Sequence, residues 1–167
     1  MTLILHTMEN RDDNLDKLKE AVKKLYSETR AVRCPYFNED VVFSPEGYRH
    51  LLYKGRDNEK RRDKRSRFMR LKLFRLAPEL LCLTKTVQEY FSTSHFVPIK
   101  HHKKKEKVLR HVEYWGFVAI LKERRIKVIV RQVHNGPKQF WSLIPNWRRG
   151  NKSHTPVIIH TGNPESD

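Results

Sequence analysis

A predicted β-hairpin within IKVIVRQVHNGPKQFWSLIPNW, residues 126–147, constrains the fold more than any other stretch of this chain. Its first half is rich in Val and Ile, its second half is another strand-like run, and Pro145 ends it. Between the halves lies His-Asn-Gly-Pro, and Asn-Gly is the strongest short signal for a hairpin turn. Because Pro137 has no N–H to close a two-residue turn, the sequence favours a four-residue loop closed by Val133 and Lys138.

This loop predicts a register in which Arg131 faces Phe140 and Ile129 faces Ser142. Successive side chains of a strand alternate between the two faces of a sheet. One face is then apolar and is expected to lie in the core: Ile126, Val128, Val130, Trp141 and Leu143. The other mixes cations, a hydroxyl and an aromatic ring: Lys127, Ile129, Arg131, Lys138, Phe140, Ser142 and Ile144. It either binds a phosphate with a stacked base or is a solvated outer face, and a slip of one residue would reverse the assignment.

The composition predicts one basic domain with an anionic partner. The chain of 167 residues carries a formal charge of +16, which favours RNA, DNA, an anionic membrane or an acidic protein as the partner. No apolar run is long enough to cross a bilayer, and Leu3-Ile4-Leu5 is too short for a secretory signal, so we expect a cytoplasmic protein without a membrane partner.

The cysteines and histidines do not predict a metal site. Cys34 and Cys82 form no CxxC pair, which argues against a zinc finger or ribbon. Cys82 lies in an apolar run and is expected to be a buried thiol. His101 and His102 lie in a lysine-rich run without acidic or thiolate neighbours, so we interpret them as loop residues.

Two helices are predicted in the N-terminal third. In 12–29, leucine and valine recur at three- and four-residue spacing, which is typical of an amphipathic helix. A short strand at 41–43 leads to Ser44-Pro45, an N-cap followed by proline at the first helical position. The helix that begins there is expected to run to Lys54, with a core stripe of Tyr48, Leu51 and Leu52. His50 and Lys54 share another stripe, and they are either functional or an ordinary surface pair.

The segment 54–75 is the most basic part of the chain. It contains eleven Lys or Arg and three acids, too one-sided for helical ion pairing to explain. A helix is expected to enter at about 58–63 and to end before Ala77-Pro78, with arginines along its exposed face. The candidate RNA-binding residues are Lys54, Arg61, Arg62, Lys64, Arg65 and Arg67, with Lys103, Lys104 and Phe140 added from elsewhere.

Together with the residues after Ala77, the sequence predicts an α+β fold with N-terminal helices packed on a small antiparallel β-sheet meander. A helix is expected over 78–90, and 91–111 has no period, so its basic run is interpreted as a mobile loop that contacts RNA or is a solvated insertion. VEYWGFVAIL at 112–121 is apolar on both faces and predicts a central strand. We expect a single domain of residues 1–167, with an N-terminal helical element at 1–35, a core at 41–147 and a tail at 148–167.

Two stretches resemble a known superfamily. VVFSPEGYRHLL leads a strand into a helix with His50, and VIVRQVHNGPKQFWSLIPNW places Arg131 before a hairpin and Ser142 after it. Together with the helical first half and the basic charge, these stretches resemble the nuclease superfamily that includes barnase, EndoU, colicin-type tRNases and RelE-type toxins. The likeness is to its phage-associated members. The likeness covers about 41–147; the basic segment 54–75 and the insertion near 100–107 depart from it.

The resemblance implies a metal-independent endoribonuclease, without cofactor, that cleaves RNA by attack of a 2′-OH on the adjacent phosphate. His50 would act as base or acid, since its reference pKa lies near neutrality. Arg131 would hold the phosphate and Ser142 would orient one of its oxygens. Lys138 would be a second phosphate contact, and His134 or His111 would make the other proton transfer. The candidate catalytic residues are therefore His50, Arg131, Ser142, Lys138 and His134.

The resemblance also implies a toxin neutralised by an acidic antitoxin or immunity protein, with tRNA, mRNA or ribosome-bound RNA as the substrate. Besides this enzyme, two other classes of protein stay open from the sequence. The same charge and aromatic residues also suit a non-catalytic RNA- or DNA-binding module, or a ribosome-associated basic protein. Convergence of His50, Arg131 and Ser142 in space would favour the enzyme.

Overall fold

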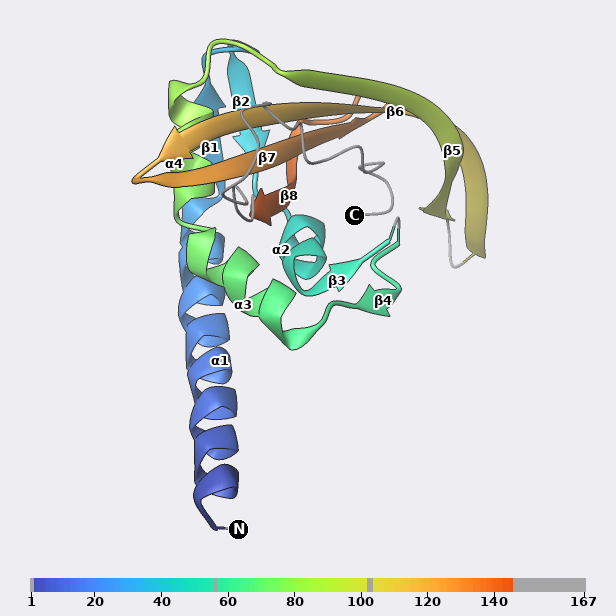
Figure 1. Cartoon of the computed structure of the whole chain (residues 1–167). Helices are drawn as coiled ribbons and strands as arrows, with labels where there is room; N and C mark the ends of the chain where they lie inside the picture. Colours follow the sequence, from blue (N-terminus) through green and yellow to red (C-terminus); the bar gives the residue numbers. More distant parts are fainter. Residues whose placement is uncertain (1, 56, 102–103, 146–167) are drawn as a thin grey trace, which may run out of the picture.

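The computed structural model describes residues 2–55, 57–101 and 104–145, which form an α+β fold (Figure 1). Six strands form one sheet in the order β1-β2-β8-β7-β6-β5. Their bounds are β1 (Ala31–Cys34), β2 (Glu39–Val42), β5 (Glu89–His101), β6 (Lys104–Leu121), β7 (Arg124–Val133) and β8 (Gln139–Pro145). The helices and the small second sheet are α1 (Thr2–Thr29), α2 (Pro45–Leu52), α3 (Lys64–Leu73), α4 (Leu76–Leu83), β3 (Tyr53–Lys54) and β4 (Lys60–Arg61).

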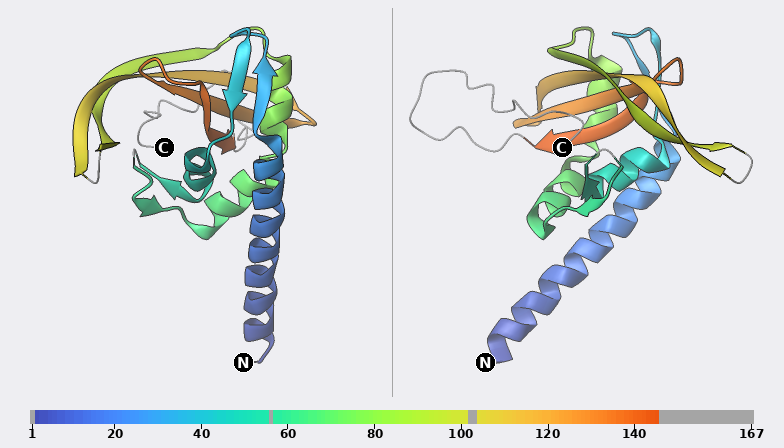
Figure 2. Two further views of the ribbon diagram at one scale, coloured as in Figure 1. Left: turned by 180° about the vertical axis from the view of Figure 1, so that it is seen from behind. Right: turned by 90° about the vertical axis from the view of Figure 1, so that its right-hand side faces the viewer.

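The sheet is larger than the sequence predicts. Strands β6 to β8 form the expected antiparallel meander. The sheet continues beyond it on both sides, because β5 pairs antiparallel with β6, β2 adds to β8 in parallel, and β1 extends that edge. Helix α1 projects beyond the rest of the molecule, as both views in Figure 2 show. None of the described helices combines the length and the apolar character needed to cross a bilayer.

The large sheet buries apolar side chains on both faces. Ile126, Val128 and Val130 of β7 belong to the main core, together with residues from all four helices. The intervening Ile129 belongs to a second, smaller cluster, as alternation along a strand requires. The residues buried in the second cluster are Val112, Tyr114, Ile129, Trp141 and Ile144.

Because of a β-bulge, the side chains of β8 before Ser142 lie on other faces of the sheet than predicted. Ile129 pairs with Ser142 as expected, but Val130 pairs with Phe140 and Arg131 with Gln139, so Trp141 is the extra residue. Phe140 therefore turns into the main core, where its ring stacks on Phe43 at 5.1 Å, and it is fully buried. The prediction that Phe140 binds RNA is wrong for this reason, and Trp141 lies on the face that the sequence had assigned to Phe140.

Three further expectations are wrong. The helix predicted over 78–90 ends at Leu83, and Tyr90 lies in β5. The predicted loop at 91–111 is instead a pair of long strands, β5 and β6, whose ends run beyond the other strands and curve (Figure 1). Cys34 is the buried thiol and Cys82 is exposed, the reverse of the interpretation from the apolar run around Cys82.

Candidate functional site

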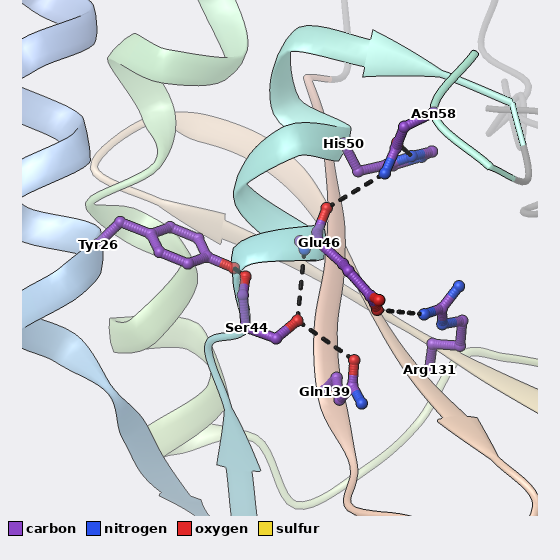
Figure 3. Close-up of polar contacts among 8 residues, drawn as sticks. Tyr26, Ser44, Glu46, His50, Asn58, Arg131 and Gln139 are labelled. Atoms are coloured by element: carbon purple, nitrogen blue, oxygen red, sulfur yellow. Dashed lines mark hydrogen bonds and ion pairs between the residues drawn. The ribbon is translucent and has the colours of Figure 1, made fainter. Parts of the chain in front are cut away.

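Helix α2 is fixed against β8 by the start signal that the sequence predicts. Ser44 is the N-cap, and its Oγ accepts a hydrogen bond from the Gly47 amide at 3.4 Å. The same hydroxyl contacts Gln139 Oε1 of β8 at 3.2 Å, and the Tyr26 hydroxyl of α1 donates to the Ser44 carbonyl at 2.7 Å (Figure 3). Two elements, α1 and β8, thereby hold the first turn of α2, which carries Glu46 and leads to His50.

His50 and Arg131 meet at one indole ring. The His50 imidazole stacks on Trp141 with ring centroids 4.2 Å apart, and the Arg131 Cζ atom lies 3.6 Å from the centroid of the Trp141 ring. His50 comes from α2 and Arg131 from β7, so this is a tertiary arrangement that the hairpin alone does not specify. We call His50, Arg131, Trp141 and the adjoining Glu46 the indole cluster.

The imidazole of His50 is a neutral tautomer with both nitrogens engaged. Its Nδ1 lies 2.6 Å from Asn58 Oδ1, and its Nε2 lies 3.2 Å from Arg62 Nη2. A guanidinium can only donate, so Nε2 accepts and Nδ1–H donates to Asn58. His50 is fully buried, whereas the sequence had placed it off the core stripe of its helix.

The chain on either side of β4 supplies these partners, since Asn58 lies in the loop before this strand and Arg62 directly follows it. Asn58 adopts φ 55°, a left-handed conformation that Asn tolerates better than most residues, and this turns its amide toward α2. Its Nδ2 also contacts the Glu46 carbonyl oxygen at 3.4 Å (Figure 3). Arg62 is buried and its Nε donates to the His50 carbonyl at 3.0 Å. The predicted surface arginine Arg62 is therefore part of the site's interior wall.

Arg131 is a buried cation with a carboxylate at its outer edge. Its Nη2 donates to Glu46 Oε2 at 3.1 Å, and the Glu46 side chain is 65% exposed (Figure 3). Burial lowers the pKa of Arg131, while Tyr114 and Glu46 oppose that shift. Within the described structure its buried Nε lacks a hydrogen-bond partner. A guanidinium with donors left over is suited to an anion with several oxygens, such as a phosphate.

Ser142 follows Trp141 but is engaged in a structural contact. It is fully buried, and its Oγ accepts a hydrogen bond from Arg70 Nη1 of α3 at 2.8 Å. The same Arg70 nitrogen donates to the Leu143 carbonyl at 2.7 Å. Ser142 therefore joins α3 to β8 in this structure.

Lys138 and His134 lie apart from the indole cluster. Lys138 pairs with Glu39 at 2.9 Å, and its Nζ lies 5.0 Å from the Phe37 ring centroid, on the side of the main core. His134 is exposed in the hairpin turn with φ 51°, and its amide donates to the His111 carbonyl. The structure does not bring either of them to Trp141.

The candidate RNA-binding residues divide by exposure. The exposed ones are Arg61, Lys64, Arg65 and Lys104, whereas Lys54 and Arg67 are half-buried. Lys103 lies outside the described residues. Within the described ranges, no three His, Cys, Asp or Glu side chains gather as potential ligands for one metal ion.

The sequence interpretation missed Glu46, Asn58 and Trp141 as members of the site. Glu46 had a usable signal, because it lies four residues before His50 and so shares a face of α2 with it. Asn58 had none, because its contact depends on a loop conformation. Comparisons of the chain with models of protein families, with curated proteins and with solved structures find no match.

Proposed function

We propose that this protein is a metal-independent endoribonuclease whose active site is the indole cluster. One observation carries the proposal: His50 and Arg131, separated by about half of the chain, contact the same Trp141 ring. They are the residue types needed for proton transfer and for stabilising a phosphorane. The charge of +16 supports a polyanionic substrate.

Arg131 would hold the scissile phosphate. A phosphate oxygen would replace the Glu46 carboxylate on the Arg131 guanidinium, since a guanidinium binds the anionic oxygens of carboxylates and of phosphates. The buried position strengthens the interaction with the charge that develops on the phosphorane.

His50 and Glu46 would share the two proton transfers. One removes the proton from the ribose 2′-OH as that oxygen attacks phosphorus, and the other protonates the departing 5′-oxygen. The basic nitrogen of His50 is Nε2, which accepts from Arg62 in the structure. A bound phosphate is a stronger acceptor than neutral imidazole, so it would draw the Arg62 guanidinium away and free Nε2.

The test is cleavage of total RNA in the presence of EDTA, followed by analysis of the product ends. We expect cyclic 2′,3′-phosphate or 3′-phosphate ends with 5′-hydroxyl ends. Arg131→Gln should reduce the rate about 10²-fold or more, the effect of losing one transition-state donor. Lys127→Gln is the matched control, because Lys127 is a buried cation on the same face of β7 whose partner is Glu89. Equal losses in the two variants would contradict the proposed role of Arg131.

A non-catalytic nucleic-acid-binding module is the second candidate. The observation that favours it is the engagement of both His50 nitrogens in a fully buried ring. Wild-type protein that binds RNA tightly but leaves it intact would select this candidate. An acidic neutralising protein that covers the basic surface belongs to the toxin form of the first candidate, and co-purification with such a partner would test it.

A further inference from the structure

The ends of β5 and β6 form a two-stranded ribbon outside the rest of the sheet. Strand β6 pairs with β7 only from Val112 to Leu121, whereas its residues 104–111 pair with β5 alone. The ribbon, residues 94–101 and 104–111, is about 26 Å long at the usual rise per residue. Figures 1 and 2 show it projecting beyond the other strands.

One face of the ribbon is exposed along its whole length. Residues directly opposite in an antiparallel pair lie on the same face. This face consists of the pairs Ser94–His111, Phe96–Leu109, Pro98–Lys107 and Lys100–Lys105, all of which are exposed. The opposite face is partly covered: His95 is buried and Val97 packs against the second apolar cluster. We call the exposed face the outer ribbon face.

The outer ribbon face combines aromatic and cationic groups. Phe96 is 60% exposed and its cross-strand partner Leu109 is 57% exposed, which is unusual for two large apolar side chains in contact range. Lys100, Lys105 and Lys107 lie on the same face, between this pair and the ribbon tip. Among the described residues, no ion pair joins these three lysines to a carboxylate.

We propose that the outer ribbon face binds single-stranded RNA, with a base stacked on Phe96 and the phosphates on the three lysines. Surfaces that bind single strands combine exposed aromatic rings with a basic track for the backbone. From Phe96 to Lys100 the ribbon spans about 13 Å, a distance of a few nucleotides. A duplex keeps its bases stacked inside, so it offers Phe96 nothing to stack on. The proposal extends the proposed function, since it adds a binding surface distinct from the indole cluster.

The test measures binding of a labelled single-stranded 2′-O-methyl RNA of twelve nucleotides, and of the same sequence as a duplex, by fluorescence anisotropy. This probe lacks a free 2′-OH and cannot be cleaved by the proposed reaction, so the result does not depend on catalysis. Phe96→Ser should weaken binding of the single strand about tenfold or more, the usual loss for one stacked base. Its control is Ile120→Ser, because Ile120 is 70% exposed on β6 but lies outside the ribbon.

The lysines have a matched control in α1. Lys105→Gln with Lys107→Gln should weaken binding of the single strand more than Lys23→Gln with Lys24→Gln, which changes the net charge equally at exposed sites.

Equal binding of the single strand by Phe96→Ser and Ile120→Ser would overturn the proposal. The proposal would also be overturned if the Lys105 and Lys107 variant lost affinity while Phe96→Ser kept it, because RNA would then contact the face through its phosphates only. Binding of poly-glutamate that depends on Phe96, without oligonucleotide binding, would assign the face to an acidic protein and also overturn it.

Discussion

At the scale of single residues, Glu46 has two roles in the proposed site, both of which depend on its position beside Arg131. The carboxylate occupies the guanidinium edge at which a phosphate would bind, and it is also a group that could exchange a proton with the reacting oxygens. Removing the charge of Glu46 should therefore have two opposite effects: it favours phosphate binding and disfavours proton transfer.

Glu46→Gln should therefore bind RNA more tightly and cleave it more slowly. The gain in affinity should be about two- to fivefold, because an ion pair with one exposed partner contributes little. The loss of rate should be about 10²- to 10⁴-fold, the usual share of a general acid or base. Kd from anisotropy with the 2′-O-methyl probe and single-turnover cleavage rates give the two values.

Glu39→Gln is the control for this prediction. Glu39 pairs with Lys138 at 2.9 Å, away from Trp141, and its substitution changes the net charge of the protein equally. If Glu39→Gln raises the affinity as much as Glu46→Gln does, the gain is a general charge effect. If Glu46→Gln cleaves at the wild-type rate, Glu46 takes no part in proton transfer.

The residues also show which parts of the site could be predicted from sequence. Ser44-Pro45 and Arg131 were predictable, since a helix start and a strand position follow from local sequence. The exchange of Phe140 and Trp141 was not, because a bulge shifts the alternation by one residue without leaving a pattern in the strand's own composition. The burial of His50 depends on Asn58 and Arg62, which flank β4, and on Trp141 of β8.

At the scale of elements, the docking of α2 on β8 determines where Glu46 and His50 lie. Gly47 is the point of closest approach: a Cβ atom there would overlap the Phe140 carbonyl oxygen and the Tyr26 hydroxyl. The oxygen belongs to the backbone of β8, so it has little freedom to move.

Gly47→Ala should destabilise the protein although alanine favours helix. The gain in helix propensity is about 1 kcal/mol, and forcing a methyl group into a packed site costs about 1–3 kcal/mol or more. We expect a lower free energy of unfolding in urea and slower RNA cleavage, because α2 would move away from β8 with Glu46 and His50. Arg49→Ala, at an exposed position of the same helix, should change both far less. A Gly47→Ala protein as stable as the wild type would show that α2 is not held as closely as described.

The β5–β6 ribbon shows why sequence patterns failed at this scale. A strand is recognised by alternation of polar and apolar residues because one of its faces is buried. In the ribbon, the outer face is exposed along its length, and Lys104, Lys105, Glu106 and Lys107 are consecutive exposed residues. Without a fully buried face the period of two disappears, and a basic strand looks like a basic loop.

At the scale of the whole molecule, the excess of positive charge should dominate affinity for RNA. Each lysine or arginine contact with phosphate releases a counterion, so the logarithm of the binding constant should fall linearly with the logarithm of salt concentration. For single strands the slope is about −0.7 for each phosphate neutralised. A binding constant that does not change with salt would exclude a phosphate-contacting surface.

The β3–β4 hairpin tests where those contacts lie. Lys60 and Arg61 are exposed and form β4. Asn58 and Arg62, on either side of this strand, line the indole cluster, so RNA at that cluster should also contact the hairpin. Lys60→Gln with Arg61→Gln should reduce the magnitude of the salt slope by about 1.4, the value for two phosphates, and should weaken all RNA sequences about equally, since phosphate contacts carry no sequence information. The measurement is the salt dependence of Kd for several unrelated single strands, beside Lys23→Gln with Lys24→Gln on α1. An unchanged slope in the β4 variant, or loss of affinity for one sequence only, would place the RNA backbone elsewhere on this protein.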